Sequence, residues 1–109
     1  MNLKEIVSRF SGLHIEEIRS SSEDAQELVF TNERIEEWDK VFQEILGPAV
    51  KPKGTKPTKE DSQLTADYGG IFANQTLYRK EFGDETIVAM LWPWQDGVHI
   101  TLKMVLLKK

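Results

Sequence analysis

Two histidines are the residues of this chain best suited to acid–base chemistry, because imidazole titrates near neutral pH. His14 lies between Leu13 and Ile15, whereas His99 follows Asp96 by three residues. A catalytic histidine needs an oriented carboxylate or a nucleophile within hydrogen-bond reach, and the chain has no G-x-S-x-G, H-E-x-x-H or H-x-H motif. Cysteine is absent, which excludes disulfides and thiolate catalysis. We therefore predict no catalytic residues, no metal site and no cofactor.

The tripeptide Trp92-Pro93-Trp94 is the strongest sign of a binding site. Two indoles separated by one residue on a strand project to the same face, about 7 Å apart. Such a pair can form a stacking floor for a flat ligand or a hot spot for a protein partner. It can equally cap the end of a core. The candidate binding residues are Tyr68, Trp92, Trp94 and His99.

The elements that would position these side chains lie between Gly70 and Lys109, where the pattern predicts a three-stranded antiparallel meander. Asp96-Gly97 is typical of a two-residue hairpin turn and sets the register of the last two strands. That register opposes Ile87 to Leu106 and Leu91 to Leu102 on an apolar core face. The register of the first hairpin, around Gly83-Asp84, stays open.

The opposite face of the meander is too apolar for open water. Because two helical stripes are too few to cover both faces, we expect this face to seat a second copy of the chain or another protein. The predicted interface residues are Val88, Met90, Val105 and Leu107.

Two amphipathic helices are expected before the meander. Leu3, Ile6 and Phe10 recur at helical spacing, and a longer stripe runs through Asn32 to Leu46, with its apolar residues facing the meander core. The short first helix is expected to cover part of the second face. Ala25 to Phe30 reads as an extra N-terminal strand, while residues 13–24 remain ambiguous.

Residues 47–67 predict a flexible connector, because three prolines alternate there with four lysines. Thr58 and Asp61 have the spacing that caps one helical turn. The connector is either a tether that lets the long helix fold back over the sheet or a basic arm that reaches an anionic partner.

Composition predicts one α+β domain over residues 1–109. The net charge of −4 is concentrated in an acidic first half, which argues against nucleic-acid binding. No apolar run approaches the ~20 residues of a membrane span, so we expect a cytoplasmic protein. We favour a non-catalytic interaction or binding module that self-associates as a homodimer. The alternative is a small-ligand-binding protein or minor enzyme with its pocket near the four candidate residues.

Overall fold

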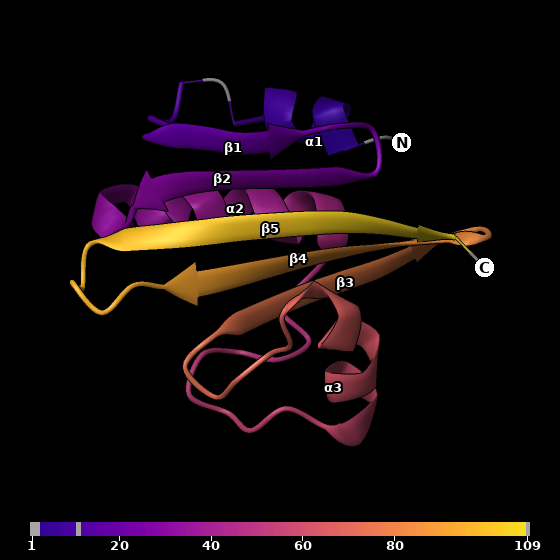
Figure 1. The fold of residues 1–109 in the computed structure, drawn as a ribbon. Coiled ribbons are helices and arrows are strands. Elements are labelled where there is room, and N and C mark those ends of the chain that lie inside the picture. Colours follow the sequence, from indigo (N-terminus) through magenta and orange to yellow (C-terminus); the bar gives the residue numbers. More distant parts are fainter. Residues whose placement is uncertain (1–2, 11, 109) are drawn as a thin grey trace.

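A single five-stranded antiparallel sheet forms the centre of the fold. The structure is a computed structural model and describes residues 3–10 and 12–108. The strands are β1 (Glu17–Ser21), β2 (Ala25–Thr31), β3 (Thr76–Phe82), β4 (Glu85–Pro93) and β5 (His99–Lys108). Their order across the sheet is β1-β2-β5-β4-β3 (Figure 1). This arrangement confirms the predicted α+β class, although the sheet has more strands than the sequence suggested.

The register predicted for the last two strands is confirmed. Ile87 lies opposite Leu106, and Leu91 opposite Leu102. The ladder reaches the hydrogen bond from Trp94 N to His99 O at 2.8 Å, beyond which residues 95–98 turn the chain. Gly97 has a positive φ of 73°, a conformation that residues with a Cβ rarely adopt. The first hairpin, left open by the sequence, closes tightly at Gly83-Asp84, because Phe82 pairs with Glu85.

The N-terminal hairpin completes the same sheet. Strand β2 pairs along its whole length with β5, from Ala25 opposite Val105 to Thr31 opposite His99. Strand β1 pairs only with β2 and forms one edge of the sheet. The candidate strand at Ala25 to Phe30 is therefore confirmed, and it places β5 at the centre of the sheet rather than at an edge.

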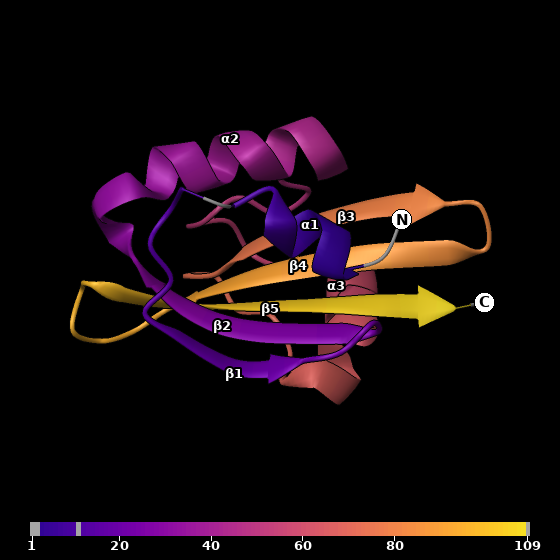
Figure 2. The same cartoon turned by 90° about the horizontal axis from the view of Figure 1, so that it is seen from above.

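One face of the sheet is covered by two helices, α1 (Leu3–Ser8) and α2 (Ile35–Leu46), the latter preceded by a short 3₁₀ turn, η1 (Asn32–Arg34) (Figure 2). Trp38 of α2 stacks on Phe10 and Phe30, with ring centroids 4.4 and 4.0 Å apart. The apolar stripe of α2 joins Leu91 and Leu102 in this core, as predicted. Helix α1 packs into the same core rather than on the second face, which corrects the sequence expectation.

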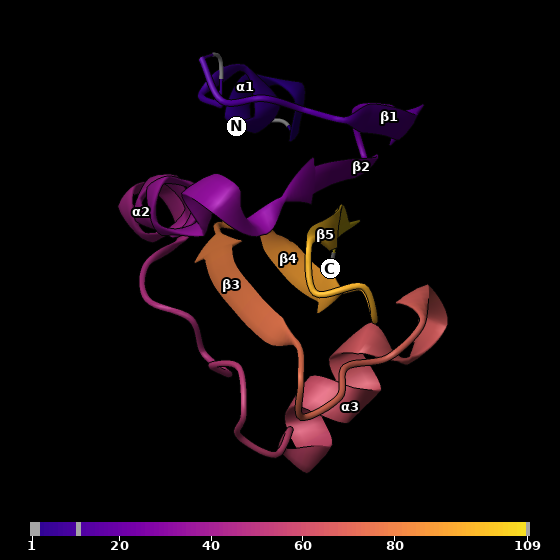
Figure 3. The same ribbon diagram turned by 90° about the vertical axis from the view of Figure 1, so that its left-hand side faces the viewer.

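The second face of the sheet is covered within the single chain. Helix α3 (Lys59–Thr65) and the 3₁₀ turn η2 (Ala66–Tyr68) lie on the opposite side of the sheet from α1 and α2 (Figure 3). Val88, Met90 and Val105 have exposed fractions of 1%, 0% and 3%, and Leu107 packs half-buried against them. The expectation that this face is open is therefore wrong. The face gives no ground for a homodimer, because residues of the expected connector already cover it.

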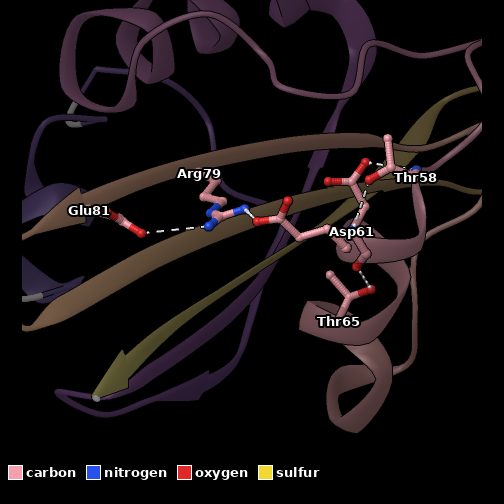
Figure 4. A network of polar contacts seen from close by, with 6 residues as sticks. Thr58, Asp61, Thr65, Arg79 and Glu81 are labelled. Atoms are coloured by element: carbon pink, nitrogen blue, oxygen red, sulfur yellow. Dashed lines mark hydrogen bonds and ion pairs between the residues drawn. The ribbon is translucent and has the colours of Figure 1, made fainter.

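Polar contacts fix α3 to the sheet (Figure 4). Thr58 and Asp61 form a capping box, so the predicted cap is confirmed and starts a helix of seven residues instead of one turn. Arg79 of β3 binds Glu60 of α3, with 2.6 Å between Nη1 and Oε1. Earlier in the same segment, Lys51 pairs with Leu77 at the edge of β3. The stretch expected as a connector thus contributes a helix and an edge contact.

None of the helices within residues 3–10 and 12–108 has the long apolar run that crossing a membrane requires.

Candidate functional site: a groove beside helix α2

The four candidate binding residues separate into two pairs. Trp94 and His99 lie together at the turn between β4 and β5, with ring centroids 4.7 Å apart. Tyr68 and Trp92 instead pack against the buried residues of the second face. The structure therefore does not gather the four side chains into one pocket.

A cationic side chain of the protein itself lies close to each of the two indole rings. The Lys103 Nζ atom lies 5.6 Å from the ring centroid of Trp92, and the Arg19 guanidinium carbon lies 5.4 Å from that of Trp94. Trp94 also donates from Nε1 to Thr101 Oγ1 at 2.8 Å. The two rings thus form no bare stacking floor, and Trp94 is positioned as part of the sheet end.

A histidine–carboxylate pair stands at the same turn. Asp96 Oδ1 accepts backbone hydrogen bonds from Val98 and His99 at 2.8 and 3.0 Å, and Asp96 Oδ2 lies 2.5 Å from His99 Nδ1. These contacts, the backbone bond from His99 first, lower the pKa of Asp96 to about 2. The anionic carboxylate places the Nδ1 proton of His99 toward itself and leaves Nε2 available for a ligand.

A groove runs from this turn along helix α2. It consists of two adjoining cavities of about 440 and 380 Å³, which share Ile35, Lys53, Thr76 and Leu91 as lining residues. Together these cavities are called the α2 groove. Its further lining residues are Glu36, Asp39, Gln43, Pro48, Ala49, Pro52 and Tyr78 in the first cavity, and Asn32, Pro93, Trp94, Gly97, His99 and Ile100 in the second.

The walls of the groove are held by hydrogen bonds within the protein. On the α2 side, Asp39 accepts from the Tyr78 hydroxyl and, at 2.6 Å, from Gln43 Nε2. Burial first, and then this bond to Asp39, raises the pKa of Tyr78. On the opposite side, Val50 N donates to Leu77 O at 2.9 Å and carries the segment that contains Lys53. The groove is therefore preformed.

The polar groups differ between the two cavities. Among the described residues that line the second cavity there is no carboxylate, and Lys53 lines both cavities. The first cavity has the carboxylates of Glu36 and Asp39 on its α2 wall. The carboxylates that line the groove therefore belong to its first cavity, while Ile35 and Leu91 give both cavities an apolar floor.

Sequence reasoning found one end of the groove and missed the rest. The sequence predicts Trp94 and His99 as binding residues, but Ile35, Thr76 and Lys53 come from elements whose contact the sequence does not reveal. The only signal was the lysine-rich connector, one reading of which was a basic arm for an anionic partner. No group of three or more metal-ligating side chains occurs within residues 3–10 and 12–108.

Comparison of the chain with protein-family models, curated proteins and solved structures finds no match. The functional argument therefore rests on the geometry of the groove.

Proposed function

We propose that this protein is a non-catalytic binding module that holds an elongated ligand with an apolar body in the α2 groove. The observation that carries the proposal is the continuity of the groove, since four residues line both of its cavities. Cavities of this size, with apolar surfaces and a few polar groups, are typical of ligand sites. Burial of a ligand's apolar surface on Ile35 and Leu91 would supply the affinity.

The polar groups of the groove favour recognition over catalysis. Asp39 is engaged by Tyr78 and Gln43, and Asn32 Nδ2 donates to Gly97 O at 2.6 Å. These side chains hold the groove in shape and are not poised beside a nucleophile. The sheet-face self-association expected from the sequence loses its support, because α3 covers that face.

A fluorescent apolar anion provides the direct test. Titration of the protein with anilinonaphthalene sulfonate should give a saturable rise in dye emission, because the dye pairs an aromatic body with a charge that Lys53 can meet. Thr76→Phe places a ring in the middle of the groove and should weaken dye binding by at least about tenfold.

Lys80→Phe is the matched control, because Thr76, Tyr78 and Lys80 alternate onto the same face of β3 and Lys80 is exposed outside the groove. This variant should bind the dye as the unaltered protein does. Amide chemical shifts recorded alongside should move at Ile35, Lys53 and His99. Equal dye binding by Thr76→Phe and the unaltered protein, or no saturable binding at all, would contradict the proposal.

A further inference from the structure

We infer that this protein pairs with a second copy of itself through the outer edge of strand β1, so that two sheets join antiparallel with Ile18 on the two-fold axis. This pairing is independent of the α2 groove, and it uses an edge of the sheet rather than either of its faces. Two observations support it: the two borders of the sheet are unequal, and the side chains of β1 follow a self-complementary order.

The two border strands of the sheet, β1 and β3, differ in what lies beside them (Figure 1). At the β3 border, Leu77 N donates to Lys51 O at 3.0 Å and Leu77 O accepts from Val50 N at 2.9 Å, so the chain itself pairs with β3 there. At the other border, β1 pairs with β2 alone among the described strands. The outer backbone groups of such a border strand are available to another strand. Strand β1 is therefore the edge that can accept one.

Strand β1 has an exposed apolar residue between two opposite charges. Ile18 is 60% exposed, although Leu28, its partner on β2, is buried. Glu17 and Arg19 flank Ile18 and lie on one face of the strand, because Arg19 Nε is 3.4 Å from Glu17 Oε2. Edges rich in lysine repel a second copy. The two charges of β1 have opposite signs, so a second copy is attracted wherever each charge meets its opposite.

A two-fold axis at Ile18 brings opposite charges together. In an antiparallel pair with this axis, Glu17 of each copy faces Arg19 of the other, and opposed Cβ atoms lie about 4.5–5.5 Å apart. Ile18 meets Ile18 at the centre, which removes apolar surface of both copies from water. An axis at either neighbouring residue would set Glu17 against Glu17 or Arg19 against Arg19. Of these three symmetric registers, the charge order selects the one centred on Ile18.

A β-bulge limits the length of this pairing. The register with β2 passes from Ile18 opposite Leu28 to Ser20 opposite Glu27, so Arg19 has no partner residue on β2. Bulges twist a strand locally, and we therefore expect only the stretch around Ile18 to pair. An interface this short belongs to the weak, reversible class, which predicts a dimer with a Kd on the order of 0.1 mM.

Sedimentation equilibrium between about 10 µM and 1 mM tests the self-association. The average mass should rise with concentration toward twice the monomer mass, and amide chemical shifts should move with concentration at residues 17–19. A protein that is still monomeric at about 1 mM would overturn the inference. A dimer whose concentration-dependent shifts lie outside β1 would overturn it too.

An exchange of charges tests the register. Glu17→Arg sets arginine against arginine at both pairs, and Arg19→Glu sets glutamate against glutamate, so each variant alone should dimerise at least about tenfold more weakly. An equimolar mixture of the two variants restores opposite charges at both pairs and should form a heterodimer as readily as the unaltered protein dimerises. Folded variants that do not associate when mixed would contradict this register.

The control pair for the exchange is Glu33→Arg and Lys40→Glu, which make the same changes of charge at exposed residues of η1 and α2. Each should alter the Kd of the dimer less than about twofold, and mixing them should gain nothing. Control variants that weaken the dimer as much as Glu17→Arg and Arg19→Glu would show that net charge, and not the order along β1, governs association.

A substitution at the axis gives a second measurement that does not depend on the charged pairs. Ile18→Lys sets two ammonium groups against each other and should weaken the dimer at least about tenfold. Val98→Lys, at another exposed apolar residue, is its matched control and should change the Kd less than about twofold. If Ile18→Lys dimerises like the unaltered protein, or if Val98→Lys weakens the dimer equally, the axis does not lie at Ile18 and the inference is lost.

Discussion

Replacing Lys51 with methionine should destabilise the protein by about 1–3 kcal/mol. Lys51 is only 2% exposed, and its Nζ donates to Pro52 O and Ala73 O at 3.1 Å each and to Gln75 O at 2.5 Å. The side chain thereby joins the groove wall to the loop that leads into β3. Methionine preserves most of the side-chain volume and removes the charge and all three donors.

Loss of the hydrogen bond from Lys51 Nζ does not affect the three carbonyl oxygens equally. Pro52 O keeps Thr55, which donates from Oγ1 at 2.8 Å, and Ala73 O keeps the Gly54 amide at 2.7 Å. Gln75 O is left with no other donor described, and one buried unsatisfied carbonyl costs about 1–3 kcal/mol. Removing a buried ammonium also removes its desolvation cost, which keeps the loss below the ~3–5 kcal/mol of a broken buried ion pair.

Urea denaturation monitored by tryptophan fluorescence measures this difference, with Lys53→Met as the matched control. Lys53 is exposed two residues further on, so its replacement should stay within about 0.5 kcal/mol. Unchanged or increased stability of Lys51→Met would refute the reasoning, as would an equal loss in the control.

The pH dependence of the same pair gives a second readout. Burial lowers the pKa of Lys51, and the charge of Asp61 partly opposes this shift. Between the lowered folded-state pKa and lysine's ordinary value, the unfolded chain holds more protons, so this residue makes stability rise with pH there. The gap in unfolding free energy between the unaltered protein and Lys51→Met should therefore widen across that window, and a narrowing gap would contradict it.

Three further expectations follow from the core, a helix cap and a turn. Trp38→Ala should cost about 3–5 kcal/mol by chemical denaturation, because the indole is fully buried between two stacked rings; a loss below ~1 kcal/mol would contradict the docking of α2. Thr58→Ala should cost ~1 kcal/mol and speed amide exchange in α3, since it removes the bond to the Asp61 amide; unchanged exchange would exclude the capping box as its anchor. An NMR titration should place the Asp96 carboxyl midpoint at about 2. Because its folded-state pKa is depressed, its stabilising effect is lost as the pH falls through that midpoint, and a midpoint near 3.8 would contradict the Asp96–His99 contacts.

The sequence carried enough information for local structure. The turn at Asp96-Gly97 and the alternation of apolar residues determined the pairing of β4 with β5, and the stripe through Trp38 and Phe42 determined which face of α2 is buried. Both depend on neighbours within one hairpin or one helix, where side-chain periodicity reports the buried side directly.

The contacts that the sequence could not reveal join distant segments. Strand β2 was recognised as a candidate strand, but its place beside β5 depends on residues far along the chain. Helix α3 was seen only as a possible cap, because its apolar side rests on few residues, including Leu64, and it is stabilised by the capping box and by Arg79. The α2 groove was missed for the same reason: α2, the Lys53 segment and β3 meet only in the folded state.

The central position of β5 has a consequence for how the protein is made. Strand β2 is synthesised long before β5, yet β5 lies between β2 and β4 and pairs with both. Until residues 99–108 emerge, the hairpin β1–β2 and the strands β3–β4 each carry an unpaired edge, which is prone to pair with other chains. The nascent protein therefore depends on its last strand to protect the earlier ones, and shortening β5 should produce aggregation during synthesis rather than a smaller folded domain.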